Sequence, residues 1–160
     1  MTKFQHQVDS LQNDKLLIGK FDEIINKYPG TLSGRLSLLY KGDIQLQLRE
    51  FDEAIKTFEA FLNKTGNNTF YVSLAMNGLG YCYEEKNNYE KGLSSFQKIV
   101  ELGEASQLAN AYLGVGRCYE KLGKNKEAIE NYKKFLKVSE KSQMMNMVLE
   151  KIANLEGRAS

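Results

Sequence analysis

The sequence has few residues that interrupt helices, no long apolar run and no excess charge of one sign. Only one of its 160 residues, Pro29, is a proline, so long uninterrupted helices are permitted. No stretch approaches the roughly 18 consecutive apolar residues of a membrane-spanning helix, and residues 1–12 hold no apolar core of signal-peptide length. We therefore expect no direct membrane insertion of this chain.

The charge balance argues against a nucleic-acid partner. The chain carries 22 Lys and Arg against 20 Asp and Glu, a formal net charge of +2. Its lysines alternate with glutamates, as on a solvent-exposed helix face, whereas a nucleic-acid-binding protein gathers its basic residues on one face. The composition thus predicts a folded protein that does not bind nucleic acid.

What the sequence does contain is an internal repeat. Three glycines, Gly42, Gly80 and Gly116, follow one another at intervals of 38 and 36 residues. Each is followed by a small residue after 12 positions, an aromatic residue after 16 and a large apolar residue after 19. In that order, these are Ala54, Gly92 and Ala128; Phe58, Phe96 and Tyr132; Phe61, Ile99 and Phe135. So many matched offsets predict a repeated structural unit.

Each unit is predicted to be a pair of helices. In the second unit the two helices are expected near residues 70–86 and 89–102, with a polar turn at Asn87–Asn88 between them. The glycine of the first helix and the small residue of the second let the two axes approach, while the aromatic side chain fills the gap. One pair cannot bury its apolar stripe alone, so we expect neighbouring pairs to stack.

This pattern resembles the signature of the tetratricopeptide-repeat (TPR) family, Leu-Gly-x-x-Tyr in one helix and Ala-x-x-x-Phe in the next. The resemblance extends from about Asp14 to Leu155, with departures at Lys41, Gln45 and Gly92. It implies an all-α fold, a right-handed superhelix (α-solenoid) of antiparallel helix pairs. It also implies a non-catalytic protein–protein interaction module.

The repeat divides the sequence into expected segments. We expect a single TPR domain over residues 1–160. It would consist of a partial N-terminal repeat (14–30), repeats at 35–66, 70–103 and 106–140, and a C-terminal capping helix (142–156).

Residues suited to catalysis or metal binding are scarce. The one histidine, His6, is expected to be solvent-exposed, and a zinc site would need both cysteines together with carboxylates. Cys82 and Cys118 occupy the same position in successive repeats, so their helices should be about 10 Å apart, beyond the roughly 7 Å that a disulfide spans. We interpret them as small buried side chains, and we predict no enzymatic activity, metal or cofactor.

The first helices of TPR pairs line the concave groove of the family, so the resemblance implies which residues face a partner. These positions are six and three residues before each repeated glycine, and one, four and five after it. They are Leu36, Leu39, Asp43, Leu46 and Gln47; Leu74, Asn77, Tyr81, Glu84 and Glu85; Asn110, Leu113, Arg117, Glu120 and Lys121. Such a groove suits an amphipathic or extended peptide. The alternative is that some of the leucines only pack against the N-terminal helix.

Two subclasses of the family can be compared with these positions. TPR proteins that hold chaperone tails resemble one another in a Lys, Asn and Arg clamp for a terminal carboxylate. Here Leu39, Asp43 and Leu113 occupy inward positions, and an aspartate repels a carboxylate, so we expect no binding of such a tail.

The long repeat period and residues 28–43 look similar to bacterial cell-envelope TPR proteins of the YfgM-like ancillary translocon type or the Tol-Pal/BamD-like type. That resemblance implies a periplasmic location behind an anchor or signal, with a cytoplasmic location as the alternative.

Two non-catalytic hypotheses follow. The first is an adaptor that binds a partner peptide or helix in the concave groove, as an envelope assembly or translocon accessory factor. The second is a structural scaffold that self-associates through the ends of the array, for example through the helix that contains Met144, Met145 and Met147.

Overall fold

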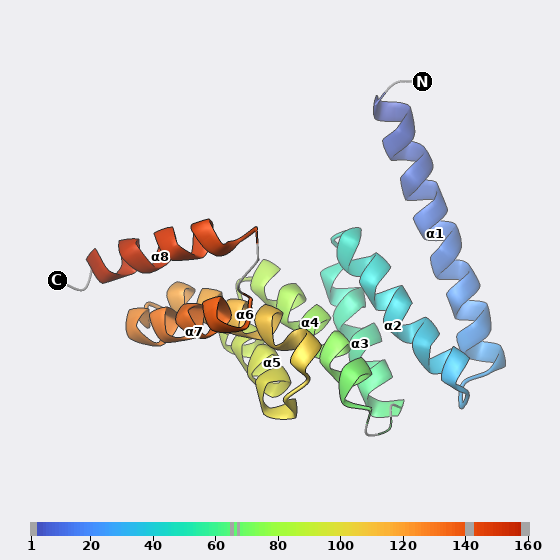
Figure 1. Cartoon of the computed structure of the whole chain (residues 1–160). Helices are drawn as coiled ribbons and strands as arrows, with labels where there is room; N and C mark the ends of the chain where they lie inside the picture. The colour runs from blue at the N-terminus through green and yellow to red at the C-terminus, as the bar shows by residue number, and fades with distance from the viewer. Residues whose placement is uncertain (1–2, 65, 67, 140–142, 158–160) are drawn as a thin grey trace. The chain divides into compact units, whose positions relative to one another are not determined.

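The computed structural model describes residues 3–64, 66, 68–139 and 143–157, with side chains from Gln12 onward. Over these residues all regular structure is helical, which confirms the predicted all-α class (Figure 1). The helices are α1 (Lys3–Lys27), α2 (Leu32–Gln47), α3 (Phe51–Lys64), α4 (Thr69–Glu85), α5 (Tyr89–Leu102), the 3₁₀ turn η1 (Ala105–Gln107), α6 (Leu108–Lys121), α7 (Asn125–Val138) and α8 (Met145–Gly157). The prediction for the His6 side chain lies outside the described residues. None of the described helices is both long and apolar enough to span a bilayer.

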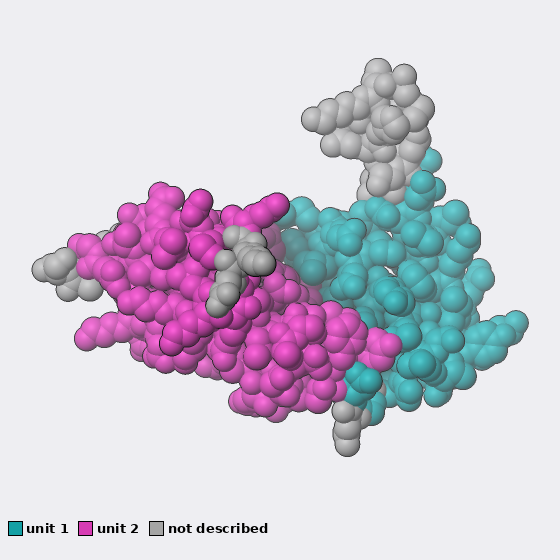
Figure 2. Space-filling view, viewed as in Figure 1, with its two compact units in different colours: residues 1–68 teal, residues 69–160 magenta. Residues whose placement is uncertain are grey.

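The helices form two compact units (Figure 2). Unit 1, residues 1–68, contains α1 to α3, and unit 2, residues 69–160, contains α4 to α8. Inside each unit, helices that follow one another in the chain pack side by side. The expected division of the whole chain into repeats stays a prediction.

In unit 1, α2 and α3 pair around one glycine. A Cβ atom on Gly42 would lie 2.7 Å from the Phe58 ring, which is fully buried. Before this pair, α1 packs on α2, and an ion pair of 2.5 Å joins Lys41 of α2 to Asp22 of α1. The first repeated glycine therefore makes the close approach that the sequence predicts.

In unit 2, one aromatic ring serves two helices. The Phe96 ring of α5 lies against both Gly80 of α4 and Gly114 of α6, where added Cβ atoms would be 2.5 and 2.6 Å from it. The next pair repeats the contact, because a Cβ on Gly116 would be 2.5 Å from Tyr132 of α7. These rings fill gaps that only glycine leaves open.

The turn inside each pair has the same backbone conformation. Arg49, Asn87 and Gly123 each lie seven residues after a repeated glycine, and all adopt positive φ, at 62°, 57° and 72°. A residue in the left-handed backbone conformation ends the first helix of the pair, so that the second helix can fold back on it. Three residue types with different backbone preferences thus occupy equivalent turns.

The last helix, α8, closes unit 2. Val148, Ile152 and Leu155 of α8 are buried in a core cluster with residues of α6 and α7, among them Tyr132 and Phe135. Leu149, next to Val148 in the same helix, is 49% exposed. Cys82 and Cys118 are both fully buried, which confirms their interpretation as buried thiols.

Candidate functional site

A cleft in unit 2 brings together predicted inward residues of α4 and α6. It has a volume of about 290 Å³ and is called the inner cleft below. Its lining consists of Tyr81, Glu84 and Glu85 of α4, Tyr89 at the start of α5, Arg117, Glu120 and Lys121 of α6, and Lys151 of α8. Six of these eight residues are in the set that the repeat pattern predicts to face inward.

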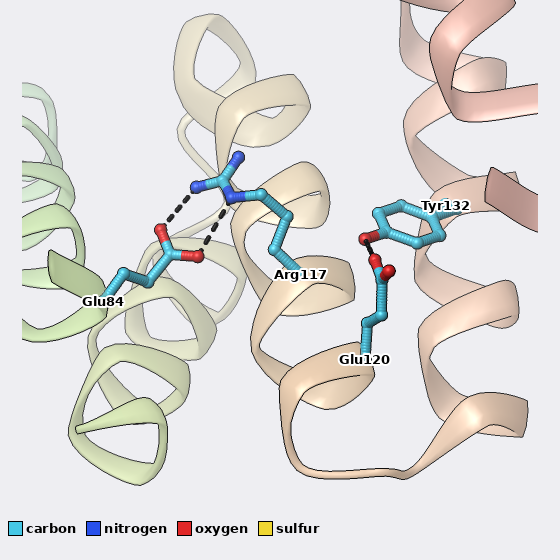
Figure 3. Close-up of polar contacts among 4 residues, drawn as sticks. All are labelled: Glu84, Arg117, Glu120 and Tyr132. Atoms are coloured by element: carbon cyan, nitrogen blue, oxygen red, sulfur yellow. Dashed lines mark hydrogen bonds and ion pairs between the residues drawn. The ribbon is translucent and has the colours of Figure 1, made fainter. Parts of the chain in front are cut away.

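The first helices of two successive pairs in unit 2, α4 and α6, are joined by a bidentate ion pair. The Arg117 guanidinium donates from Nε to Glu84 Oε1 at 2.9 Å and from Nη2 to Glu84 Oε2 at 2.5 Å (Figure 3). Burial by itself lowers the pKa of Arg117, but the hydrogen bond and charge of Glu84 outweigh burial, so the net pKa is raised. The guanidinium thus remains charged and fixed in orientation.

The same arginine lies on an aromatic pair. Tyr81 and Phe96 meet edge to face with ring centroids 5.5 Å apart. The guanidinium carbon of Arg117 is 5.2 Å from the centroid of Tyr81 and 5.8 Å from that of Phe96. Cation–π attraction at these distances adds to the ion pair. This wall of the inner cleft is therefore rigid and anchored on the core ring Phe96.

Glu120 joins three helices at the other wall. Its Oε2 accepts hydrogen bonds from the Tyr132 hydroxyl of α7 at 2.6 Å and from Lys151 Nζ of α8 at 2.8 Å. Figure 3 shows the Tyr132 hydroxyl directed at this carboxylate. Burial alone raises the pKa of Glu120, but the hydrogen bonds from Lys151 and Tyr132 lower it more, so the net pKa is below its usual value. The pKa of Tyr132 is raised, first by burial and then by its bond to Glu120.

The charges of the inner cleft balance. Three carboxylates, Glu84, Glu85 and Glu120, face three cations, Arg117, Lys121 and Lys151. Glu85 and Lys121 are exposed at the rim, whereas Glu84 and Arg117 are half-buried. The arrangement offers fixed donors and acceptors of both signs. Among the described residues no group of three His, Cys, Asp or Glu side chains could hold a metal ion.

The remaining predicted residues of unit 2 do not line this cleft. Asn110 is exposed on α6, and Leu113 is only 3% exposed because it packs in the core with α7 and α8. Asn77 is half-buried in α4, and its Oδ1 is buried with no hydrogen-bond partner among the described residues.

The other predicted residues belong to α2 of unit 1. Leu39 is 3% exposed, and Leu36, Asp43 and Leu46 are half-buried. Burial raises the pKa of the Asp43 carboxyl to about 6. Their part in a binding groove stays a prediction.

Two lining residues escaped the sequence prediction. Tyr89 begins the second helix of its pair, and Lys151 lies on the closing helix α8, which has no repeated glycine from which to count. A signal for Lys151 was present, because it lies three residues after Val148 and one before Ile152, at the edge of the apolar stripe.

Models of known protein families match two parts of the sequence. Two models, each described as a tetratricopeptide repeat, match residues 71–141 and residues 36–64. The chain belongs to the tetratricopeptide-repeat family. A search of the curated proteins finds no match to the sequence.

Solved structures of other proteins share this fold. The TPR2AB domain of yeast Sti1, in a complex with pHSP90, is 25% identical and superposes with a TM-score of 0.64 over 79% of this chain. This chain spans about half, 48%, of that structure. MamA is 14% identical, with a TM-score of 0.69, over 99% of this chain and 96% of its own. A TPR protein from Parabacteroides merdae is 20% identical, with a TM-score of 0.69, over 92% of this chain and 61% of its own.

The TPR signature and the inner cleft use different residues. The signature glycines and aromatics, such as Gly80 and Phe96, make the close contacts inside the helix pairs. The cleft side chains, such as Glu84, Arg117 and Lys121, stand at the positions between them. Membership of the TPR family therefore accounts for the scaffold, and the ligand preference depends on residues that the signature does not specify.

Proposed function

We propose that the protein is a non-catalytic interaction module that binds a segment of another protein in the inner cleft. The observation that carries this proposal is the cleft itself, where charged side chains and tyrosine rings of four helices, α4, α5, α6 and α8, converge on one site. The Sti1 domain in its complex with pHSP90 is a TPR structure of 25% identity that holds a partner protein. TPR proteins generally act by binding and not by catalysis, so membership of the family supports a binding function.

The rigidity of the cleft favours this role. Arg117 is held by Glu84 and by two rings, and Glu120 is held by Tyr132 and Lys151. Side chains that are already ordered lose little conformational entropy when a ligand binds. The cleft can therefore offer its donors and acceptors to a peptide at low entropic cost.

The charge pattern indicates the kind of segment. With three carboxylates and three cations, the cleft favours a segment that carries both signs of charge. A terminal carboxylate would have to displace Glu84 to gain both hydrogen bonds of Arg117. We therefore propose an amphipathic peptide or helix of mixed charge as the occupant, in place of an acidic tail.

The biological setting that we propose is assembly at a bacterial envelope, as a translocon or envelope accessory factor. This setting rests on the likeness of residues 28–43 and of the repeat period to envelope TPR proteins. The structures compared above bear on the fold and leave the setting a proposal.

Photo-crosslinking tests the site. A photoreactive amino acid is placed at Lys121, on the rim of the inner cleft, or at Lys126, an exposed lysine of α7 outside the cleft. We expect a discrete crosslinked partner from position 121 that position 126 does not yield. Equal capture from both positions, or none from position 121, would count against the inner cleft.

Self-association is a second candidate, favoured by apolar side chains around α8. Met144 and Met147 are each 40% exposed, and Leu149 is 49% exposed. Light scattering of the purified chain, and of a variant with Met147→Lys and Leu149→Lys together, measures this directly. A dimer that becomes a monomer in the variant supports a scaffold role, and a monomer in both cases removes it.

A further inference from the structure

A second cleft lies on another side of unit 2, between α5 and α7. Its volume is about 460 Å³, and it is called the outer cleft below. Its lining consists of Gln97, Val100 and Glu101 of α5, Tyr112, Val115 and Tyr119 of α6, and Glu127, Glu130, Asn131 and Lys134 of α7. At about 100° per residue, positions 112, 115 and 119 lie nearly opposite positions 117, 120 and 121 on α6. The two clefts therefore use opposite faces of the same helix.

The floor of the outer cleft is apolar and aromatic. Val115 is buried, and Val100 and the rings of Tyr112 and Tyr119 are half-buried. The Tyr119 hydroxyl accepts a hydrogen bond from Gln97 Nε2 at 3.1 Å, and Lys124 Nζ lies 5.9 Å from the Tyr119 ring centroid. The floor thus combines aliphatic surface with rings that attract cations.

The rim of the outer cleft is acidic. Three carboxylates, Glu101, Glu127 and Glu130, line it with a single lysine, Lys134. Glu101 has an exposed partner in Lys98, at 2.9 Å, with the two side chains 66% and 50% exposed. Such surface pairs contribute little and exchange partners readily. The rim therefore carries an excess of negative charge that the cleft itself does not neutralise.

Lys134 shows how a cation fits this surface. Its Nζ lies 2.7 Å from Glu130 Oε1 on the same helix, and the hydrogen bond that it donates to Glu130 is the first cause of its raised pKa. The side chain is 44% exposed at the edge of the cleft, where its charge meets a carboxylate. A lysine or arginine from another chain could repeat this arrangement at Glu127.

We propose that the outer cleft binds a basic segment of a partner protein. A lysine or arginine stem would lie on Val100 and Val115, and its charged end would meet Glu127 and Glu101 beside the Tyr112 ring. The volume lies at the lower end of the range of about 300–1,000 Å³ that holds compact ligands, enough for a few side chains. This contact is independent of the inner cleft, and the module then has two separate partner surfaces.

Peptide titration of the full chain tests the proposal. The probe is a short peptide of alternating lysine and alanine, with a matched peptide in which glutamate replaces lysine. Amide chemical shifts of the isotope-labelled chain report both affinity and location. We expect saturable shifts at Tyr112, Val115 and Glu127 with the lysine peptide and none with the glutamate peptide.

Charge variants decide whether the contact is local. Glu127→Lys should weaken binding by about fivefold or more, whereas Glu150→Lys, the same change at an exposed site of α8 outside both clefts, should leave it unchanged. Lys134→Gln, which removes the one lysine among the described residues that line the outer cleft, should strengthen binding. All three positions are on helix surfaces, so the variants should remain folded.

Three outcomes would overturn the proposal. The first is a chain whose amides show no saturable shift with the lysine peptide. The second is equal weakening by Glu127→Lys and Glu150→Lys, which indicates only general attraction to charge. The third is weakening by Glu85→Lys, at the rim of the inner cleft, without an effect of Glu127→Lys.

Discussion

Arg117 and Glu84 form a bidentate ion pair that joins two consecutive helix pairs, with side chains only 25% and 14% exposed. The pair has a structural role and a binding role, because it links α4 to α6 and also forms one wall of the inner cleft. A change at either residue therefore affects stability before it affects any partner.

Removal of one member of this pair should destabilise the fold. Glu84→Ala leaves the Arg117 charge half-buried without its carboxylate, and we expect a loss of about 1–3 kcal/mol. Glu101→Ala breaks the exposed pair with Lys98 and should cost less than about 0.5 kcal/mol. Urea unfolding of both variants measures the difference, and equal costs would show that the half-buried pair does not hold α4 and α6 together.

The glycines around Phe96 should not tolerate a methyl group. Gly80→Ala or Gly114→Ala places a Cβ atom about 1 Å inside normal contact with a ring that is fully buried, so we expect a loss of about 1–3 kcal/mol. Gly19→Ala is the matched control, because this exposed glycine of α1 has nothing within 4 Å of the added Cβ. It should raise stability by up to about 1 kcal/mol through helix propensity.

A double variant tests whether the clash is with Phe96 itself. Phe96→Leu makes room beside Gly80, so Gly80→Ala should cost less in the Phe96→Leu background than in the wild type. Thermal unfolding of the four proteins gives this coupling. Additive effects would place the cost of Gly80→Ala elsewhere than at the ring.

The turn residues predict a stabilising substitution. Arg49 has a φ of 62°, where a side chain is strained and glycine is not, so Arg49→Gly should gain about 0.5–1 kcal/mol. Asn87 tolerates the same conformation better and accepts a hydrogen bond from the Tyr89 hydroxyl at 2.6 Å, so Asn87→Gly should be neutral or mildly destabilising. A melting temperature that falls for Arg49→Gly would contradict this ranking.

Asp43 should make stability depend on pH. Burial raises its pKa in the folded state from 3.8 to about 6, so folding favours the protonated carboxyl. The contribution to stability is present in full below pH 3.8 and is lost as the pH rises through about 6. Asp43→Asn should therefore stabilise the protein by about 1 kcal/mol at neutral pH, after allowance for solvent screening, and much less near pH 4. Equal shifts of melting temperature at both pH values would contradict the raised pKa.

The parts of the fold that repeat could be predicted from the sequence. The contact between Gly80 and Phe96 follows from offsets that recur three times along the sequence. The same counting, together with the resemblance to the TPR family, selects Glu84 and Arg117, which both line the inner cleft. Positive φ at Arg49 could not be predicted from arginine itself, which has no preference for that region. Only its equivalence to Asn87 and Gly123 indicates it.

Features that occur only once in the chain could not be predicted from the repeat pattern. Lys151 lines the inner cleft from the closing helix, and Leu113 is buried because that helix packs against it. The sequence also did not predict the outer cleft, because Glu101 and Glu127 resemble ordinary charged residues on solvent-exposed helix faces. Both depend on how helices distant in sequence pack, which local periodicity does not describe.

The most direct measurement of the central claim is the affinity of the partner captured from position 121 for three purified proteins. These are the wild type, Lys121→Glu at the rim of the inner cleft, and Lys126→Glu outside it. Both substitutions reverse an exposed charge, so their effect on the fold should be equally small. We predict that Kd rises about tenfold or more for Lys121→Glu and stays at the wild-type value for Lys126→Glu. Equal Kd values for all three proteins would contradict binding in the inner cleft.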